Sequence, residues 1–176
     1  MESDPIGFKG GMNTYGYVGG DPLLKIDFFG LEANLNAFGP KTAIAKAASK
    51  TTPSKLFNNI SGHGGPGQFW WGPLTHEPGY DTSPGRGINP QDLFNRLKQS
   101  EGYDPSLPTR IAACELGRGD YCQEFANISR RPVLCYDEYV WYNQNHGIVG
   151  SWRGVQPYLK SPDYNIRGKL KIFYPR

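Results

Sequence analysis

The chain has 176 residues, which is enough for one domain with a substantial core and some additional segments. Its 19 basic and 16 acidic residues nearly balance, and a net charge of +3 without a run of Lys or Arg argues against nucleic-acid binding. No apolar stretch approaches the roughly 20 residues that span a bilayer, and no N-terminal signal is visible, so we expect no membrane segment.

Residues 1–31 combine short aromatic runs with Gly, Asp and Pro, which is typical of β-structure with tight turns. The segment reads DPIGFKGGMN from Asp4, continues with YGYV and GGDP, and ends with DFFGL at Leu31. This pattern resembles the last part of the Rhs/YD-repeat core, whose signature DPxGxxGGxN is followed by YxYVxNDP and DPxGL. In that family the core forms a β-cocoon, and a variable toxin domain follows the final Leu.

The Rhs resemblance also implies self-cleavage. In that family two aspartates of the core motifs cut the chain after the final Leu. The matching residues here are Asp4 and Asp27, and the matching bond is Leu31–Glu32. Phe28 stands where the family has Pro, so the chain departs from the motif at that position.

The chain after Leu31 divides into a predicted linker, residues 32–54, and a compact domain, residues 55–176. The linker is expected to contain a short helix in the alanine-rich segment 42–50. In the compact domain we expect helices after the N-cap Asn89 and at about 120–129. A long loop is expected over 64–88, and strands at 56–60, 110–114, 132–136, 139–142, 149–152 and 170–174. Strands that alternate with helices predict an α/β fold with a mostly parallel sheet flanked by helices and antiparallel strands at the C-terminal end.

Two candidate catalytic residues stand at strand ends. His63 follows the strand predicted at 56–60, and Cys114 ends the strand predicted at 110–114. Active groups of α/β sheets gather at the carboxyl ends of the strands, and a nearby imidazole stabilises a thiolate and can take its proton. Cys122 and Cys135 are interpreted as structural. The odd number of cysteines argues against a disulfide framework and favours a reducing compartment.

The order strand, His-Gly, loop, helix, strand, Ala-Cys, helix, strand resembles the caspase/gingipain/clostripain superfamily of cysteine peptidases. The matching positions are His63-Gly64 and Ala113-Cys114. The resemblance implies a caspase-like fold in which Cys114 attacks a peptide carbonyl and His63 acts first as base and then as acid. The backbone N–H groups of Gly64 and Cys114 are the candidates for holding the oxyanion.

Other residues allow two interpretations. Trp70 and Trp71 either line a substrate groove or hold the loop in place. Asp137 and Glu138, near Cys114 in sequence order, either select a basic substrate side chain or are solvated carboxylates. We expect neither a metal nor a cofactor, because no C-x-x-C or H-x-x-x-H spacing occurs and the G-x-G-x-x-G of residues 62–67 does not precede a helix.

The two resemblances together imply a secreted Rhs effector of interbacterial competition. Its caspase-like toxin domain would act as a cysteine endopeptidase on a protein substrate in the target-cell cytoplasm. The expected partners are that substrate, the Rhs core shell and a cognate immunity protein. The alternatives are a non-proteolytic toxin, for example a nucleotide-directed one, a binding module on a degenerate caspase-like scaffold, and a structural segment of a surface Rhs protein.

Overall fold

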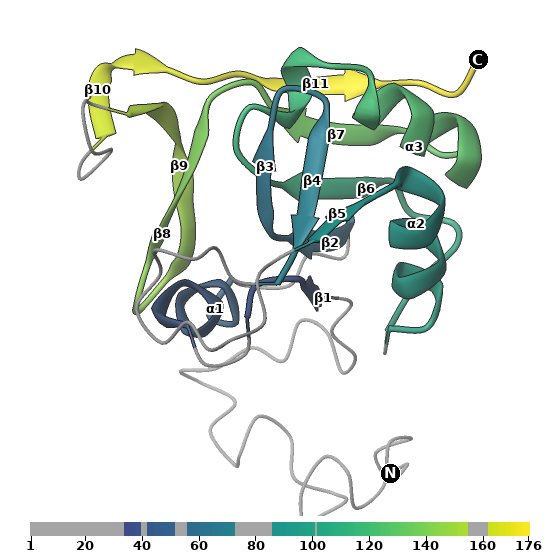
Figure 1. Cartoon of the computed structure of the whole chain (residues 1–176), viewed down its shortest axis with the longest axis horizontal. Helices are drawn as coiled ribbons and strands as arrows, with labels where there is room; N and C mark the ends of the chain where they lie inside the picture. Colours follow the sequence, from purple (N-terminus) through teal and green to yellow (C-terminus); the bar gives the residue numbers. More distant parts are fainter. Residues whose placement is uncertain (1–33, 40–41, 52–55, 73–85, 101, 155–161) are drawn as a thin grey trace, which may run out of the picture.

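The main sheet contains five strands in the spatial order β1-β2-β6-β7-β11 (Figure 1). The computed structural model describes residues 34–39, 42–51, 56–72, 86–100, 102–154 and 162–176. The four parallel strands are followed by one antiparallel edge strand, so the predicted mixed α/β fold with a mostly parallel sheet is confirmed. The strands are β1 (Asn34–Asn36), β2 (Asn58–Ser61), β6 (Thr109–Ala112), β7 (Val133–Tyr136) and β11 (Leu170–Phe173).

Two helices pack together and supply side chains to the core of this sheet: α2 (Pro90–Lys98) and α3 (Tyr121–Ser129), the latter preceded by the short 3₁₀ helix η3 (Leu116–Arg118). Helix α2 begins as predicted, because the Asn89 side chain accepts a hydrogen bond from the backbone N–H of Asp92 and Pro90 takes the first helical position. No helix among the described residues is long and apolar enough to cross a membrane.

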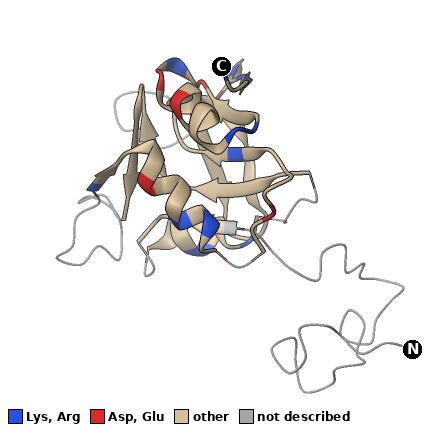
Figure 2. Ribbon diagram, turned by 90° about the vertical axis from the view of Figure 1, so that its right-hand side faces the viewer, with Lys and Arg blue, Asp and Glu red and all other residues tan. Residues whose placement is uncertain are grey.

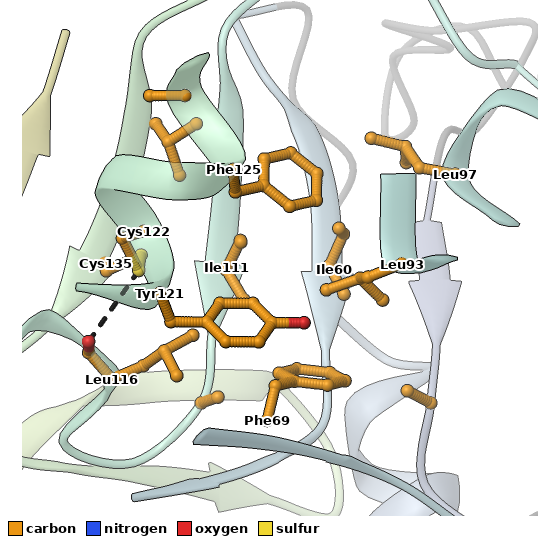
Figure 3. Close-up of a cluster of buried hydrophobic side chains, with 14 residues drawn as sticks. Ile60, Phe69, Leu93, Leu97, Ile111, Leu116, Tyr121, Cys122, Phe125 and Cys135 are labelled. Atoms are coloured by element: carbon orange, nitrogen blue, oxygen red, sulfur yellow. Dashed lines mark hydrogen bonds between the residues drawn. A yellow bond between two sulfur atoms is a disulfide. The ribbon is translucent and has the colours of Figure 1, made fainter. Parts of the chain in front are cut away.

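The hydrophobic core lies between the main sheet and these helices (Figure 3). The sheet and the two helices contribute side chains with no exposed surface, and so does β4 through Phe69. The Phe69 ring stacks on Tyr121, with the ring centres 6.1 Å apart. The fully buried side chains of this cluster include Ile60, Phe69, Leu93, Leu97, Ile111, Leu116, Phe125 and Val133.

Residues 64–72 and 86–88, the described part of the segment 64–88, form strands where the sequence predicts a long loop. Together with His63, they form a second, antiparallel sheet of β3 (His63–Gly65), β4 (Gln68–Trp71) and β5 (Arg86–Ile88). The turn between β3 and β4 contains Pro66 and Gly67, and Gly67 has a φ of +73°, which glycine adopts without strain. At residues 63–71 the Gly and Pro residues therefore belong to a tight hairpin rather than to a loop.

The described residues of the predicted linker 32–54 also belong to the fold. Strand β1 pairs with β2, and the N–H of buried Ala37 donates to the Ser61 carbonyl at 2.7 Å. The predicted short helix is present as α1 (Ala43–Ala48), capped by Thr42. It packs against the hairpin of β8 and β9 rather than standing apart (Figure 1). A three-residue strand has too short a pattern to be recognised from sequence.

A third sheet is formed by β8 (Tyr139–Asn143), β9 (Gly147–Gly154) and β10 (Pro162–Arg167). The sequence predicts β8 and β9 but not β10, and His146 lies in the turn between β8 and β9. Gly147 has a φ of +70°, and a methyl group there would lie 2.4 Å from the Thr51 Cα, so only glycine allows this turn to pack on the end of the α1 segment. Acidic and basic residues are interspersed over the described elements in the view of Figure 2.

The structure contains a disulfide, which the odd number of cysteines argued against. Cys122 of α3 and Cys135 of β7 form a disulfide inside the core, with their Cα atoms 6.6 Å apart (Figure 3). The pairing arises because α3 returns directly onto β7, which brings two buried residues of neighbouring elements together. Cys114 is the free cysteine.

Loss of this disulfide should destabilise the domain without changing its fold. The bond closes a loop with a sequence separation of 13, for which we expect the free energy of unfolding to fall by roughly 2–4 kcal/mol on removal. Urea denaturation of wild type and of Cys122→Ala/Cys135→Ala measures this difference. Thiol titration in denaturant should give one thiol before reduction and three after it. Three thiols without reductant would contradict the pairing.

Candidate active site

The register of the main sheet determines where the two candidate catalytic residues lie. Strands β2 and β6 are parallel neighbours, and their last register pair is Ser61 with Ala112. His63 and Cys114 each follow two residues later, so both leave the same carboxyl edge of the sheet from adjacent strands. This is the arrangement that the sequence pattern predicts.

Gly64 shows how closely the two strand ends approach. A methyl group at this position would lie 2.8 Å from the Ala113 Cβ and 2.8 Å from the Cys114 carbonyl oxygen. Its distance from the Cys114 nitrogen would be 3.3 Å. Any larger residue would therefore push the His63-Gly64 segment away from the Ala113-Cys114 segment.

Aromatic rings hold the imidazole of His63. The ring of Phe38 meets it edge to face, with 4.6 Å between the ring centres. Phe38 also packs edge to face on Tyr142 of β8, whose hydroxyl donates a hydrogen bond to the Ala112 carbonyl at 2.9 Å. This contact chain connects the imidazole to the end of β6, two residues before Cys114.

Cys114 lies at a sharp turn. The next residue, Glu115, has a φ of +53°, a left-handed conformation that costs a non-glycine residue roughly 1–2 kcal/mol. Backbone strain of this kind is enriched at functional sites. The Glu115 N–H donates to the Glu138 carbonyl at 3.1 Å, and the Val140 N–H donates to the Cys114 sulfur at 3.4 Å. Glu138, the residue before β8, therefore fixes the turn, and Val140 of β8 fixes the thiol.

Burial makes the Cys114 thiol a weaker acid than a free cysteine. It raises the pKa of Cys114 from 9.0 to about 11. The neighbouring Glu115 carboxylate raises the pKa further, while the Val140 N–H lowers it by less than burial raises it. The sulfur is therefore protonated at neutral pH, which differs from the expected imidazole-stabilised thiolate. A base must remove the proton during any attack by Cys114.

A pocket of about 330 Å³ opens beside Cys114, between α1 and β8. Helix α1 contributes one wall, β8 contributes the other, and Cys114 lies in the lining. The lining residues are Ala43, Ile44, Ala47, Cys114, Tyr139, Val140, Trp141, Tyr142 and Gln144. The sequence predicts the helix α1 but places it in a linker, so the α1 wall of the pocket is a feature that only the structure shows.

The acidic residues near Cys114 are engaged within the chain. Glu138 is 6% exposed and forms ion pairs with Arg118 and with Arg153, the latter at 3.3 Å. Arg118 also pairs with Glu115. Neither expectation for Glu138, solvation or contact with a basic substrate side chain, describes this arrangement.

Asp137 is likewise engaged. It accepts a hydrogen bond from the Lys169 N–H at 2.6 Å and lies 3.9 Å from the Lys171 ammonium. These contacts connect the end of β7 to the start of β11. Among the described residues, no group of three or more His, Cys, Asp and Glu side chains is placed to hold a metal ion.

The two tryptophans have different surroundings. Trp71 packs on the core and carries the guanidinium of Arg96 at 4.4 Å from its ring centre, which holds β4 against α2. Trp70 lies opposite His63 in the register of β3 and β4. The expected cleavage residues Asp4, Asp27 and Leu31 lie outside the described residues.

Residues 33–150 match a family described as a domain of unknown function, DUF8616. The chain belongs to the DUF8616 family. The match includes β1 and α1 as well as His63 and Cys114, so both walls of the pocket and both candidate residues lie within the family domain. Comparison with curated proteins and with solved structures found no match.

The buried thiol predicts slow alkylation. At pH 8 the folded protein should react with iodoacetamide about tenfold more slowly than the urea-unfolded, unreduced protein. The raised pKa of about 11 lowers the thiolate fraction, and the higher nucleophilicity of the more basic thiolate offsets part of that loss. The rate should rise about tenfold per pH unit toward pH 10. Mass spectrometry of the Cys114 peptide measures it. Rapid labelling at pH 7 would instead show a thiolate stabilised in the folded state.

Proposed function

We propose that this DUF8616 domain is a cysteine endopeptidase with Cys114 as nucleophile and His63 as general base. The observation that supports this most strongly is the parallel register of β2 and β6, which takes both residues to one sheet edge. The close approach of Gly64 to Cys114 adds a second constraint on the same pair of segments. The pocket beside Cys114 supplies a place for a substrate.

The proposed reaction is acyl transfer to the Cys114 sulfur. The sulfur attacks the carbonyl carbon of the peptide bond while its proton passes to the His63 imidazole. The backbone N–H groups of Gly64 and Cys114 are proposed to hold the oxyanion. The C–N bond then breaks, and His63 protonates the leaving amine. Water, deprotonated by His63, hydrolyses the thioester and returns the thiol.

The order of elements supports a caspase-like assignment. One helix, α2, stands between the His63 strand end and β6, and α3 follows Cys114 before β7. The two candidate residues follow the ends of neighbouring strands in the parallel part of the sheet, and an antiparallel strand closes one edge of the sheet. A fold alone does not define a function, so the proposal depends on the placement of His63 and Cys114.

We further propose that the chain is the C-terminal toxin region of an Rhs effector. The family match starts at residue 33, directly after the proposed scissile bond Leu31–Glu32, as expected for a toxin domain that follows the core. The core-internal disulfide suits a protein that passes through an oxidising environment during secretion. The proposed site of action is the target-cell cytoplasm, and the proposed partners are a protein substrate, the Rhs core shell and an immunity protein.

A binding module on a degenerate peptidase scaffold is the second candidate. The observation that favours it is the raised pKa of Cys114, because a protonated thiol beside an apolar pocket suits binding as well as catalysis. In this case the pocket would bind a ligand without cleaving it. Cys114→Ala and His63→Ala distinguish the peptidase from the binding module.

Substitution of either dyad residue should abolish or strongly reduce peptidase activity and toxicity. Cys114→Ala removes the nucleophile, and His63→Ala removes the base, which we expect to lower the rate by about 10²–10⁴-fold. Growth of bacteria that express each variant, with thermal unfolding as a folding check, measures the effect. His146→Ala, in the exposed β8–β9 turn, is the matched control and should remain toxic. Full toxicity of both dyad variants would contradict the peptidase, and a harmless wild type would favour a structural segment.

Cleavage at the end of the proposed core should depend on its two aspartates. When the chain is expressed with its upstream core, mass spectrometry should find a C-terminal fragment that begins at Glu32. Asp4→Asn and Asp27→Asn should each leave the chain intact, because the carboxylates that act on the bond are lost. Asp21→Asn, in the same segment, serves as the control and should still be cut. An uncut wild-type chain would contradict the assignment.

A further inference from the structure

We propose that the pocket between α1 and β8 binds the substrate side chain that precedes the scissile bond, and that it selects a large apolar side chain. This assignment depends on the proposed peptidase function. It names the substrate class for the same site, and it differs from the basic specificity that the acidic residues in the sequence suggested.

The position of the pocket relative to the thiol supports the assignment. Cys114 is itself one of the lining residues, and the Val140 N–H that contacts its sulfur belongs to the β8 wall. A side chain that enters between α1 and β8 therefore brings the carbonyl of its own residue next to the sulfur. The residue bound here is the one whose carbonyl is attacked.

The volume of the pocket suits one large side chain. A cavity of about 150 Å³ that is lined by apolar residues binds benzene, and this pocket has about 330 Å³. It lies at the lower end of the range for small-molecule sites, about 300–1,000 Å³. An aromatic side chain, or a branched or extended aliphatic one, fills much of this space, whereas alanine leaves most of it empty.

The composition of the pocket excludes charged side chains. None of its nine lining residues carries a formal charge at neutral pH. The nearby carboxylates of Glu115 and Glu138 are paired with Arg118 and do not belong to the lining. A Lys, Arg or Asp side chain would lose its hydration there without gaining a partner of opposite charge.

The helix wall consists of Ile44 and two alanines. Ala43 and Ala47 are one turn apart, so their methyl groups lie on the same side of α1 and leave the space open. Gln144 supplies an amide side chain to the lining and is exposed. These two positions, one small and one polar, allow the pocket to be filled or charged without changing the core.

The experiment uses irreversible peptide acyloxymethyl ketones that differ only in the residue next to the reactive group. The Cys114 sulfur displaces the carboxylate leaving group and forms a thioether, and the thiol proton is released. Labelling of the full chain should be at least about tenfold faster with Phe or Leu than with Ala, Lys or Asp at this position. Intact-mass spectrometry gives the rates, and Cys114→Ala shows which sulfur reacts.

Two variant pairs test whether the pocket determines the preference. Ala43→Trp should fill the pocket and slow labelling by the Phe probe about tenfold or more, while labelling by the Ala probe persists. Lys46→Trp, at an exposed position of α1 outside the lining, is its control. Gln144→Glu should raise the rate of the Lys probe relative to the Phe probe, whereas Asn145→Asp, in the adjacent turn outside the lining, should not.

The outcomes separate the two proposals. Labelling of Cys114 by no probe would overturn the peptidase function and this inference with it. Preferential labelling by the Lys or Asp probe, or equal rates with all probes, would leave the peptidase in place and overturn the apolar specificity. An Ala43→Trp variant that is folded and reacts with the Phe probe as fast as Lys46→Trp would show that the substrate side chain does not occupy this pocket.

Discussion

The contact of Gly64 with the Ala113-Cys114 backbone is the constraint on which the candidate site depends. Parallel pairing of β2 with β6 takes two strand ends out of the sheet at the same level, but it does not by itself bring them together. A glycine at position 64 does so, since a methyl group there would overlap with both Ala113 and the Cys114 carbonyl oxygen. The spacing of the proposed base and nucleophile therefore depends on one missing side chain.

Around this contact, elements that are distant in sequence hold each part of the site. Phe38, in the segment between β1 and α1, packs on His63 and on Tyr142. Tyr142 donates a hydrogen bond to Ala112 at the end of β6. Strand β8 also contacts the Cys114 sulfur, and Glu138, the residue before it, anchors the strained turn at Glu115. The candidate site thus lies at the edge of the main sheet, and Phe38 and β8 hold its residues in place.

The surroundings that position Cys114 also raise the pKa of its thiol. The environment that positions the Cys114 sulfur removes much of its hydration, and this burial outweighs the backbone N–H groups of Val140 and Cys114, which favour the thiolate. A protonated resting thiol is protected from oxidation and from other reagents, because the thiolate is the reactive form. In the proposed mechanism, His63 removes the proton only when a substrate is attacked.

Many local features could be predicted from the sequence alone. The Asn89-Pro90 start of α2, the helix α3 and the strands β2, β6, β7, β8, β9 and β11 follow from capping residues and apolar patterns that act over a few residues. The placement of His63 and Cys114 at neighbouring strand ends also follows, because alternating strands and helices favour a parallel sheet. Capping, periodicity and chain order are encoded locally, so they can be recognised before the fold is known.

Only the tertiary structure decided the features that depend on long-range contacts. The described residues of the predicted linker form a sheet strand and a pocket wall, and the described residues of the predicted loop belong to a second sheet. The tertiary structure joined Cys122 to Cys135, paired Glu138 with two arginines and raised the pKa of Cys114. The physical reason is the same in each case. Burial and pairing depend on which segments meet in space, and short, glycine-rich or alanine-rich segments carry little local pattern to indicate their partners.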